Sequence, residues 1–220
     1  MSIKKTKIDW CDCTVNPVVG CKNGCEYCYA RKLNDRFHFI KKWNEPVFFK
    51  ERLKQLYSKK PKSIFMNSMS DISFWEEQHS REVYKAIKDN PQHNYIFLTK
   101  GNGVFCDYEK NIFNGVTITG QKMADKAYWN VHFDFYSIEP LLEPIELHLL
   151  QNNSKLKQII IGAETGNRKG KIKPQKEWVD KIVEFADLHN IRVFMKESLR
   201  EIMEASFRQD KLIWEAANGL

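Results

Sequence analysis

The sequence predicts an α/β fold, a partial (β/α) TIM-type barrel of about six to seven parallel strands with outer helices. Two observations carry this prediction. The chain alternates short apolar runs with stretches of helical pattern, and nearly every apolar run ends at a polar or ionisable residue. The runs are rich in β-branched and aromatic residues and are mostly continuous in hydrophobicity, which is typical of parallel strands covered on both faces.

The expected strands and helices alternate along the chain. A first strand is expected near Val15, and the others at 63–67, 95–99, 116–119, 133–138, 158–162 and 192–195. Helices are expected at 28–39, 76–89, 178–188, 199–207 and 211–217. Repeated strand-then-helix units predict a parallel sheet with helical crossovers, and the alternative to a barrel is an open, doubly wound sheet.

Composition and charge describe a basic chain with ample apolar material. Hydrophobic residues make up 42%, and 35 Lys and Arg against 28 Asp and Glu give a net charge of +7. The polar breaks are short, so a single domain is expected over residues 1–220, with a cysteine loop at 20–30. No window approaches the roughly 18 apolar residues that a membrane helix needs, and the N-terminus has no apolar signal segment. We therefore expect a cytoplasmic protein without a membrane partner.

Polar or ionisable side chains follow the expected strands. They are Asn67, Ser68 and Asp71; Thr99 and Lys100; Thr119; Glu139; Glu164 and Thr165; and Lys196 and Glu197. The carboxyl ends of parallel strands meet at one rim, which is where (β/α) barrels place their chemistry. The alternative is that strands simply stop where polar residues begin, but so many acids and bases at strand ends favour a functional rim.

Five of the six cysteines lie between residues 11 and 28, which favours a metal or redox site over a disulfide framework in a reducing compartment. Cys21, Cys25 and Cys28 stand at Cx3Cx2C spacing on a loop in which Gly20 and Gly24 permit tight turns. Tetrahedral zinc would need a fourth ligand, whereas a [4Fe–4S] cluster held by three cysteines leaves one iron open. The alternative is that the three cysteines are small buried hydrophobic residues.

This motif, with an aromatic residue directly before its last cysteine, resembles that of the radical S-adenosylmethionine superfamily. Other segments resemble a small radical S-adenosylmethionine family of phages and mobile elements that has no established substrate. These segments are 8–10, 16–21, 65–71, 98–100, 138–142 and 161–166. The short first cysteine spacing, together with Cys11 and Cys13, departs from that family's pattern.

The resemblance implies an enzyme with two cofactors. Cys21, Cys25 and Cys28 would hold a [4Fe–4S] cluster whose open iron chelates S-adenosyl-L-methionine. An electron from a donor such as flavodoxin or ferredoxin would cleave that cofactor to a 5′-deoxyadenosyl radical, which abstracts hydrogen from the substrate. Cys13 and Cys106 are expected to be structural instead, as is Cys11.

The resemblance also implies which residues contact S-adenosyl-L-methionine. Tyr27 is expected against the adenine, the segment 68–71 at the methionine ammonium, and the end of the fourth strand at the ribose. The candidate cofactor-binding residues are Tyr27, Ser68, Met69, Ser70, Asp71, Thr117, Thr119, Glu139 and Glu164. The alternative role for Asp71 is to cap the N-terminus of the helix that follows it.

The candidate catalytic residues are Lys100, Glu139 and Lys196. The two lysines could hold an anionic substrate group such as phosphate, and the alternative is an ion pair with Glu139 or Glu164. Clusters of lysine on a basic chain fit a nucleotide or nucleic-acid substrate, with a solvated basic face as the alternative.

Two other functions stay open. A non-enzymatic zinc or iron–sulfur protein that binds nucleic acid would need a fourth ligand near the loop, such as His38 or Cys13. A thiol–disulfide oxidoreductase using Cys25 and Cys28 would leave Cys21 unexplained.

Overall fold

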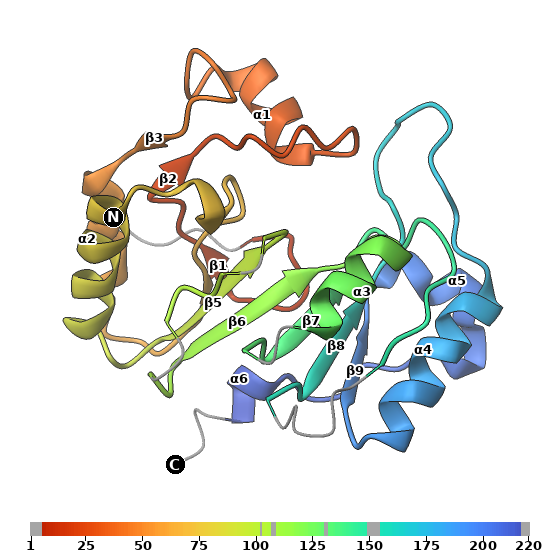
Figure 1. Ribbon diagram of the computed structural model, residues 1–220. Helices are drawn as coiled ribbons and strands as arrows, with labels where there is room; N and C mark the ends of the chain where they lie inside the picture. Colours follow the sequence, from red (N-terminus) through yellow and green to blue (C-terminus); the bar gives the residue numbers. More distant parts are fainter. Residues whose placement is uncertain (1–5, 102, 107–108, 130–131, 149–154, 217–220) are drawn as a thin grey trace. The chain divides into compact units, whose positions relative to one another are not determined.

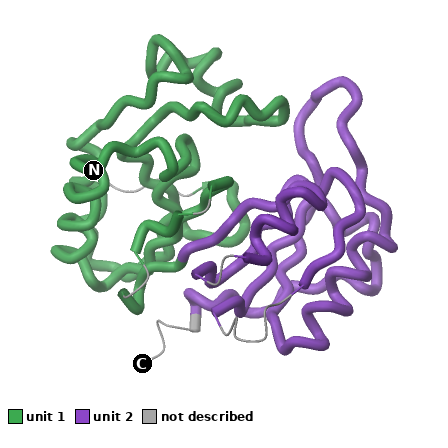
Figure 2. The backbone as a smooth tube through the Cα atoms, viewed as in Figure 1, with its two compact units in different colours: residues 1–113, 220 green, residues 114–219 purple. Residues whose placement is uncertain are grey.

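The computed structural model of the chain describes residues 6–101, 103–106, 109–129, 132–148 and 155–216. The chain clusters into two compact units, one up to Phe113 and one from Asn114 onward (Figure 2). Each unit is described by itself below. The single domain expected over residues 1–220 stays a prediction.

A seven-stranded sheet confirms the α/β fold class. Its strands are β1 (Cys13–Thr14), β4 (Ser63–Phe65), β5 (Asn94–Thr99), β6 (Ile112–Thr117), β7 (Phe135–Ile138), β8 (Gln158–Ile161) and β9 (Arg192–Met195). Their order in the sheet is β1-β4-β5-β6-β7-β8-β9, and neighbours pair in parallel (Figure 1). Each strand therefore joins the edge left by the one before it. A doubly wound sheet reverses its strand order at a switch point, so this alternative is excluded.

In the second half of the sheet, neighbouring strands are paired residue by residue. Ser137 lies opposite Thr117 on one side and Ile160 on the other, and Ile161 lies opposite Met195. Every residue of β7 and β8 is buried, as the continuous apolar runs predict. The expected strand at 116–119 is misplaced, because β6 begins at Ile112 and ends at Thr117. Asn114 and Gly115 interrupt its apolar run, which hides the first half of the strand from a hydrophobicity reading.

The longer helices lie close to their expected ranges. They are α1 (Tyr29–Phe37), α2 (Glu77–Lys88) and α4 (Lys176–Leu188). α4 buries Val179, Ile182 and Ala186, which share one helix face, and it lies beside β9 (Figure 1). None of the helices in the described ranges is long and apolar enough to cross a membrane.

Other elements differ from the expectation. The continuous helix expected at 199–207 is wrong: α5 (Arg200–Met203) lies between 3₁₀ turns at Glu197–Leu199 and Glu204–Ser206, and Glu204 has a φ of 45°. The helix expected at 211–217 is α6 (Ile213–Ala216), and residue 217 lies outside the described residues. The sequence interpretation missed β2 (Val18–Val19), β3 (Val47–Phe48), a 3₁₀ helix at Lys50–Leu56 and α3 (Gln121–Tyr128).

The core of the first unit includes two of the cysteines. Cys13 and Cys106 belong to a buried cluster with Ile64, Val83 and Phe97. Burial raises the pKa of the Cys13 thiol to about 11, so this thiol is protonated at neutral pH and behaves as a small apolar group. The structural role expected for these two cysteines agrees with this packing.

The core of the second unit packs aromatic rings on the sheet. Trp214 of α6 stands edge-on to Phe135 of β7, with ring centroids 5.2 Å apart. Gly115 of β6 is the register partner of Phe135, and a Cβ at Gly115 would overlap the ring. The glycine that obscures β6 in the sequence is therefore required by packing against the neighbouring strand.

His93 is a buried imidazole in the first unit, with no exposed surface. Its Nε2 lies 2.8 Å from the carbonyl oxygen of Leu56, so Nε2 carries the proton, while Nδ1 has no hydrogen-bond partner among the described residues. Burial lowers the pKa of His93, and the positive charge of Lys62 lowers it further. The ring is therefore held neutral.

This neutral ring predicts a loss of stability in acid. Below a pH of about 6.5 the unfolded chain binds a proton at His93 that the folded chain does not, so the free energy of unfolding falls as pH falls. Urea titrations at pH 7 and pH 5 should show the drop, and it should be smaller in His93→Gln. His189→Gln, at an exposed position, is the control and should retain the wild-type pH dependence. An unchanged slope in His93→Gln would contradict the assignment.

Candidate functional site

The cysteine loop of the first unit is shaped by two glycines. Gly20 has a φ of +114°, and a Cβ there would lie 2.9 Å from Ile40 Cδ1, the Pro46 Cα and the Trp43 carbonyl oxygen. Gly24 has a φ of +67° with open space around it. Only glycine adopts the first of these conformations without strain in such a tight place. The expectation that Gly20 and Gly24 shape this loop is therefore confirmed.

The thiols of this loop are engaged with its own backbone. Cys28 is the N-cap of α1, and its Sγ accepts a hydrogen bond of 3.3 Å from the Arg31 backbone N–H. The Sγ of Cys21 accepts one of 3.5 Å from the Asn23 N–H. Burial raises the pKa of Cys21 to about 11 and also raises that of Cys28. Both thiols are therefore protonated at neutral pH and act here as weak hydrogen-bond acceptors.

The predicted cofactors need correction. Among the residues that the structure describes, no group of three or more His, Cys, Asp or Glu side chains is placed to hold a metal ion. The prediction that Cys21, Cys25 and Cys28 hold a [4Fe–4S] cluster is therefore wrong. The prediction of S-adenosyl-L-methionine is corrected with it, because its expected ligand was the open iron of that cluster. The spacing of the cysteines sets their separation along the chain but not the direction of their thiols.

Asp71 is the anchor of this region. It is 4% exposed, and its carboxylate accepts four hydrogen bonds: from Asn23 Nδ2 (2.8 Å), Ser73 N (3.0 Å), Thr99 Oγ1 (2.7 Å) and Lys100 N (2.9 Å). A carboxylate has about four lone-pair sites, so these donors occupy its acceptor capacity. Asp71 also caps the 3₁₀ turn Ile72–Phe74, which is the capping role considered as its alternative. Through Asp71 the cysteine loop is tied to the end of β5.

The segment from Ser68 to Ser70 is held in the same way. Asn16 Oδ1 accepts hydrogen bonds from Ser68 Oγ (3.1 Å) and from Met69 N (2.9 Å). The carbonyl of Met69 accepts from Gly20 N at 3.0 Å, and Ser70 Oγ accepts from Trp75 Nε1 at 3.0 Å. This segment fastens the cysteine loop to the sheet. Sequence reasoning missed Asn16, although its position directly before Pro17 marks it as a turn residue.

Tyr27 and Lys100 are brought together. The Nζ of Lys100 lies 5.4 Å from the centroid of the Tyr27 ring, which is a cation–π distance. The backbone N–H of Lys100 belongs to the Asp71 network. Lys100 therefore lies with the cysteine loop of the first unit.

In the second unit, three neighbouring strands end in one small group of residues. Glu139 follows β7, Gly162 follows β8 and Lys196 follows β9. The Nζ of Lys196 lies 2.9 Å from Glu139 Oε2, and the two side chains are 22% and 18% exposed. Ser137 Oγ donates to Glu139 Oε1 at 3.2 Å. A Cβ at Gly162 would lie 3.0 Å from Lys196 Cδ and 3.3 Å from Glu139 Oε2, so the glycine makes room for the pair. This is the ion pair with Glu139 that the sequence left open as the alternative role of Lys196.

Glu164 has a different partner. Its side chain is 2% exposed and forms a two-pronged ion pair with Arg168, with Nε–Oε1 and Nη2–Oε2 distances of 2.6 Å and 2.7 Å. Sequence reasoning missed Arg168, although an acid and an arginine four residues apart on a glycine-bearing loop are a usable signal. Ser198 Oγ accepts from Ala163 N at 3.0 Å and holds the start of this loop.

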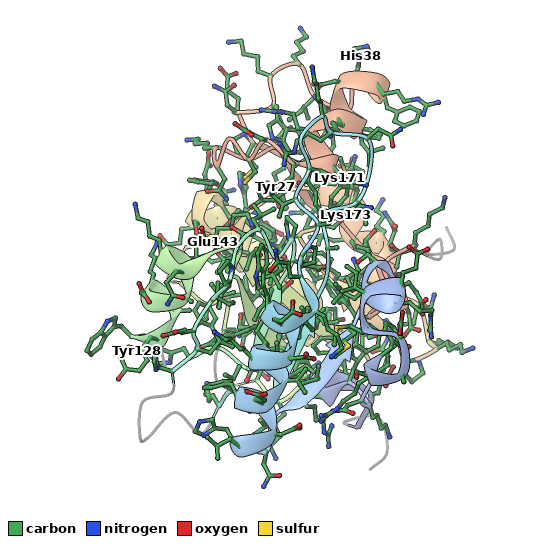
Figure 3. All side chains as sticks on the ribbon, turned by 90° about the vertical axis from the view of Figure 1, so that its right-hand side faces the viewer. Tyr27, His38, Tyr128, Glu143, Lys171 and Lys173 are labelled. Atoms are coloured by element: carbon green, nitrogen blue, oxygen red, sulfur yellow. The ribbon has the colours of Figure 1, made fainter. Side chains whose placement is uncertain are left out.

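Thr117 and Thr119 lie at and beyond the end of β6. Thr117 is buried, and Thr119 Oγ1 donates to Met123 Sδ at 3.4 Å. Glu143, labelled in Figure 3, accepts a hydrogen bond of 2.7 Å from Gln121 N and so caps α3. The carboxylate of Glu143 therefore occupies the anion-attracting N-terminus of this helix.

The described contacts thus join the predicted residues into two groups. The first unit brings together Tyr27, the cysteine loop, Ser68–Ser70, Asp71 and Lys100. The second brings together Glu139 and Lys196, with Glu164 held by Arg168 nearby in sequence. In the first group the Asp71 carboxylate is saturated by protein donors, whereas the second group contains a partly exposed acid–base pair.

Comparison with known proteins identifies one family. Residues 5–211 match the model of a family described as "Protein of unknown function (DUF5131)". An uncharacterized protein of Methanocaldococcus jannaschii is 37% identical over 110 residues, which cover 49% of this chain and 42% of that relative. The chain therefore spans less than half the length of this relative. No solved structure matches. The matched family is not the radical S-adenosylmethionine superfamily, so the membership inferred from the resemblance is wrong.

Proposed function

The chain belongs to the DUF5131 family, and from its geometry we propose an enzyme that acts on a phosphate-bearing substrate of the nucleotide class. Glu139 and Lys196 are its proposed active-site pair. The expected electron donor depended on an iron–sulfur cluster and has no part in this proposal.

The observation that carries the proposal is the Glu139–Lys196 pair above Gly162. An acid and a base stand 2.9 Å apart, both partly exposed, directly after two strands of a parallel sheet. The carboxyl ends of such strands are where α/β enzymes bind their substrates. The absence of a side chain at Gly162 lets both groups pack over the end of β8.

The pair can exchange its internal contact for a substrate. A phosphate group competes with Glu139 for the ammonium group of Lys196, because both are oxyanions that accept charge-assisted hydrogen bonds. Glu139, once released from Lys196, is a carboxylate that can accept a proton from a substrate hydroxyl. The net charge of +7 favours an anionic substrate at longer range.

Lys196→Met is expected to weaken the binding of ADP by at least about tenfold. A hydrogen bond to a charged group contributes about 1.5–3 kcal/mol, and 1.4 kcal/mol is a factor of ten in affinity. Glu139→Gln removes the competing negative charge and should leave ADP affinity equal or higher. Isothermal titration calorimetry at fixed ionic strength measures both effects.

Lys181→Met is the matched control, because it removes an equal charge from an exposed position on α4. Circular dichroism of each variant reports whether it is folded. If a folded Lys196→Met binds ADP as Lys181→Met does, the proposed phosphate site is refuted.

A non-enzymatic nucleic-acid-binding protein is the second candidate function. The observation that favours it is the long loop between β8 and α4, which carries Arg168, Lys169, Lys171 and Lys173, with no acid between Glu164 and Glu177. Figure 3 labels Lys171 and Lys173 on this loop. A loop of this length without helix or strand is usually functional. If Lys196→Met leaves all RNA and nucleotide binding unchanged and no chemical conversion is found, this function replaces the enzyme.

A cytoplasmic location is part of the proposal. The six cysteines lie in the described ranges and form no disulfide there, and cysteines kept as thiols in this number are typical of a reducing compartment.

A further inference from the structure

Helix α1 presents its apolar stripe to solvent. Tyr29, Leu33 and Phe37 are spaced four residues apart and are 52%, 37% and 53% exposed. The residues that α1 buries are Ala30 and Asn34, which are small or polar. A helix on the surface of a globular protein normally does the reverse and turns its large apolar side chains to the core. The stripe is therefore available to a ligand outside the described chain.

The chain after α1 adds a second ring to this stripe. His38, labelled in Figure 3, ends the helix with a φ of 52°, and its N–H donates to the carbonyl of Asn34 at 2.7 Å. The side chain of Asn34 then clamps Ile40 through two hydrogen bonds of 2.9 Å and 3.2 Å. This turn places the Phe39 ring 5.8 Å from that of Phe37, at an angle of 38°. The buried polar Asn34 therefore builds the exposed aromatic pair.

One cation lies at these rings, and others are near them in sequence. The guanidinium of Arg36 lies 5.0 Å from the Phe37 ring centroid. Between Tyr29 and Asn44 the chain carries Arg31, Lys32, Arg36, Lys41 and Lys42 against one acid, Asp35. Leu33, Phe37, Phe39 and the cations Lys32 and Arg36 are called the α1 face from here on.

We propose that the α1 face binds single-stranded nucleic acid, with bases stacked on Phe37 and Phe39 and phosphates at Lys32 and Arg36. Alternating aromatic rings and cations are the means by which proteins hold single strands without sequence preference. A peptide or a second copy of the chain would favour an aliphatic stripe, whereas this one is mostly aromatic and carries a cation at the Phe37 ring. The inference goes beyond the proposed active-site pair and the basic loop after β8, and it uses a different surface, in the other unit.

Fluorescence anisotropy with a labelled 12-nucleotide oligo(U), and with oligo(dT) of the same length, tests the α1 face. Phe37→Ala and Phe39→Ala should each weaken binding by about tenfold or more, as loss of one base-stacking ring does. Arg36→Gln should weaken it and lower the slope of log affinity against log salt by about one. A duplex of the same length should bind more weakly than the single strands, because its bases are not free to stack.

Trp129→Ala is the matched control, since it removes an exposed aromatic side chain from the second unit. Equal losses in Trp129→Ala and Phe37→Ala, or wild-type binding by both Phe variants, would overturn the proposal. It is also overturned if Phe37→Ala instead abolishes a dimer in sedimentation or binding to phosphatidylserine vesicles. Lys196→Met separates the two proposals, because it should lose ADP binding and keep oligo(U) binding, whereas Phe37→Ala should do the opposite. If Lys196→Met loses ADP binding while both Phe variants keep wild-type oligo(U) binding, only the α1 face is refuted.

Discussion

Asp71→Ala is expected to lower the free energy of unfolding by about 3–5 kcal/mol. The substitution removes a buried carboxylate that accepts four hydrogen bonds and leaves their donors to seek other partners. Each hydrogen bond to a charged group contributes about 1.5–3 kcal/mol, and each buried donor left unsatisfied costs about 1–3 kcal/mol. Since two of the donors sit at the end of β5 and one in the cysteine loop, both segments should loosen together.

Urea unfolding of wild type and Asp71→Ala measures this effect. Asp35→Ala is the matched control, because Asp35 is exposed on α1 and its loss should change stability little. Asp71→Asn keeps one acceptor oxygen and should fall between wild type and Asp71→Ala. A midpoint for Asp71→Ala close to that of Asp35→Ala would mean that Asp71 does not anchor the loop.

Arg168→Met is the second large effect, again with an expected loss of about 3–5 kcal/mol. It leaves the Glu164 carboxylate, whose side chain is 2% exposed, without the guanidinium that holds both of its oxygens. A buried charge stripped of its partner keeps its desolvation penalty without the compensating attraction. If the loop after β8 opens locally, Glu164 is hydrated again. The free energy of that opening is therefore the largest loss of stability that Arg168→Met can cause.

Three variants distinguish the buried charge from the loss of a surface contact. Glu164→Gln combined with Arg168→Met removes both charges and should recover much of the stability lost in the single variant. Arg200→Met is the matched control, because Arg200 makes the same two-pronged contact with Glu197 at the surface, where the loss should be small. If Arg168→Met and Arg200→Met change the unfolding midpoint equally, burial of Glu164 has no energetic consequence.

The alternation of strands and helices could be predicted from the sequence because it follows from local pattern. The continuous apolar runs at 158–162 and 192–195 correspond to β8 and β9, and the periodic segment at 178–188 corresponds to α4. β6 shows where this reasoning stops. Gly115 weakens the apolar signal of the strand, and the reason for that glycine is the ring of Phe135 on the neighbouring strand, twenty residues away.

The sequence by itself determined which residues stand at strand ends, and Glu139, Glu164 and Lys196 all lie there. Only the tertiary structure decided their partners: Lys196 pairs with Glu139 across Gly162, and Glu164 pairs with Arg168. The same limit explains the cysteine loop, where spacing predicted three neighbouring thiols but the backbone directs those of Cys21 and Cys28 to N–H donors. Local pattern determines position along an element, because it depends on a few adjacent residues. A partner on another strand, as in the Glu139–Lys196 pair, depends on how the chain packs, and the direction of a side chain depends on the backbone conformation at its position, which residue spacing does not determine.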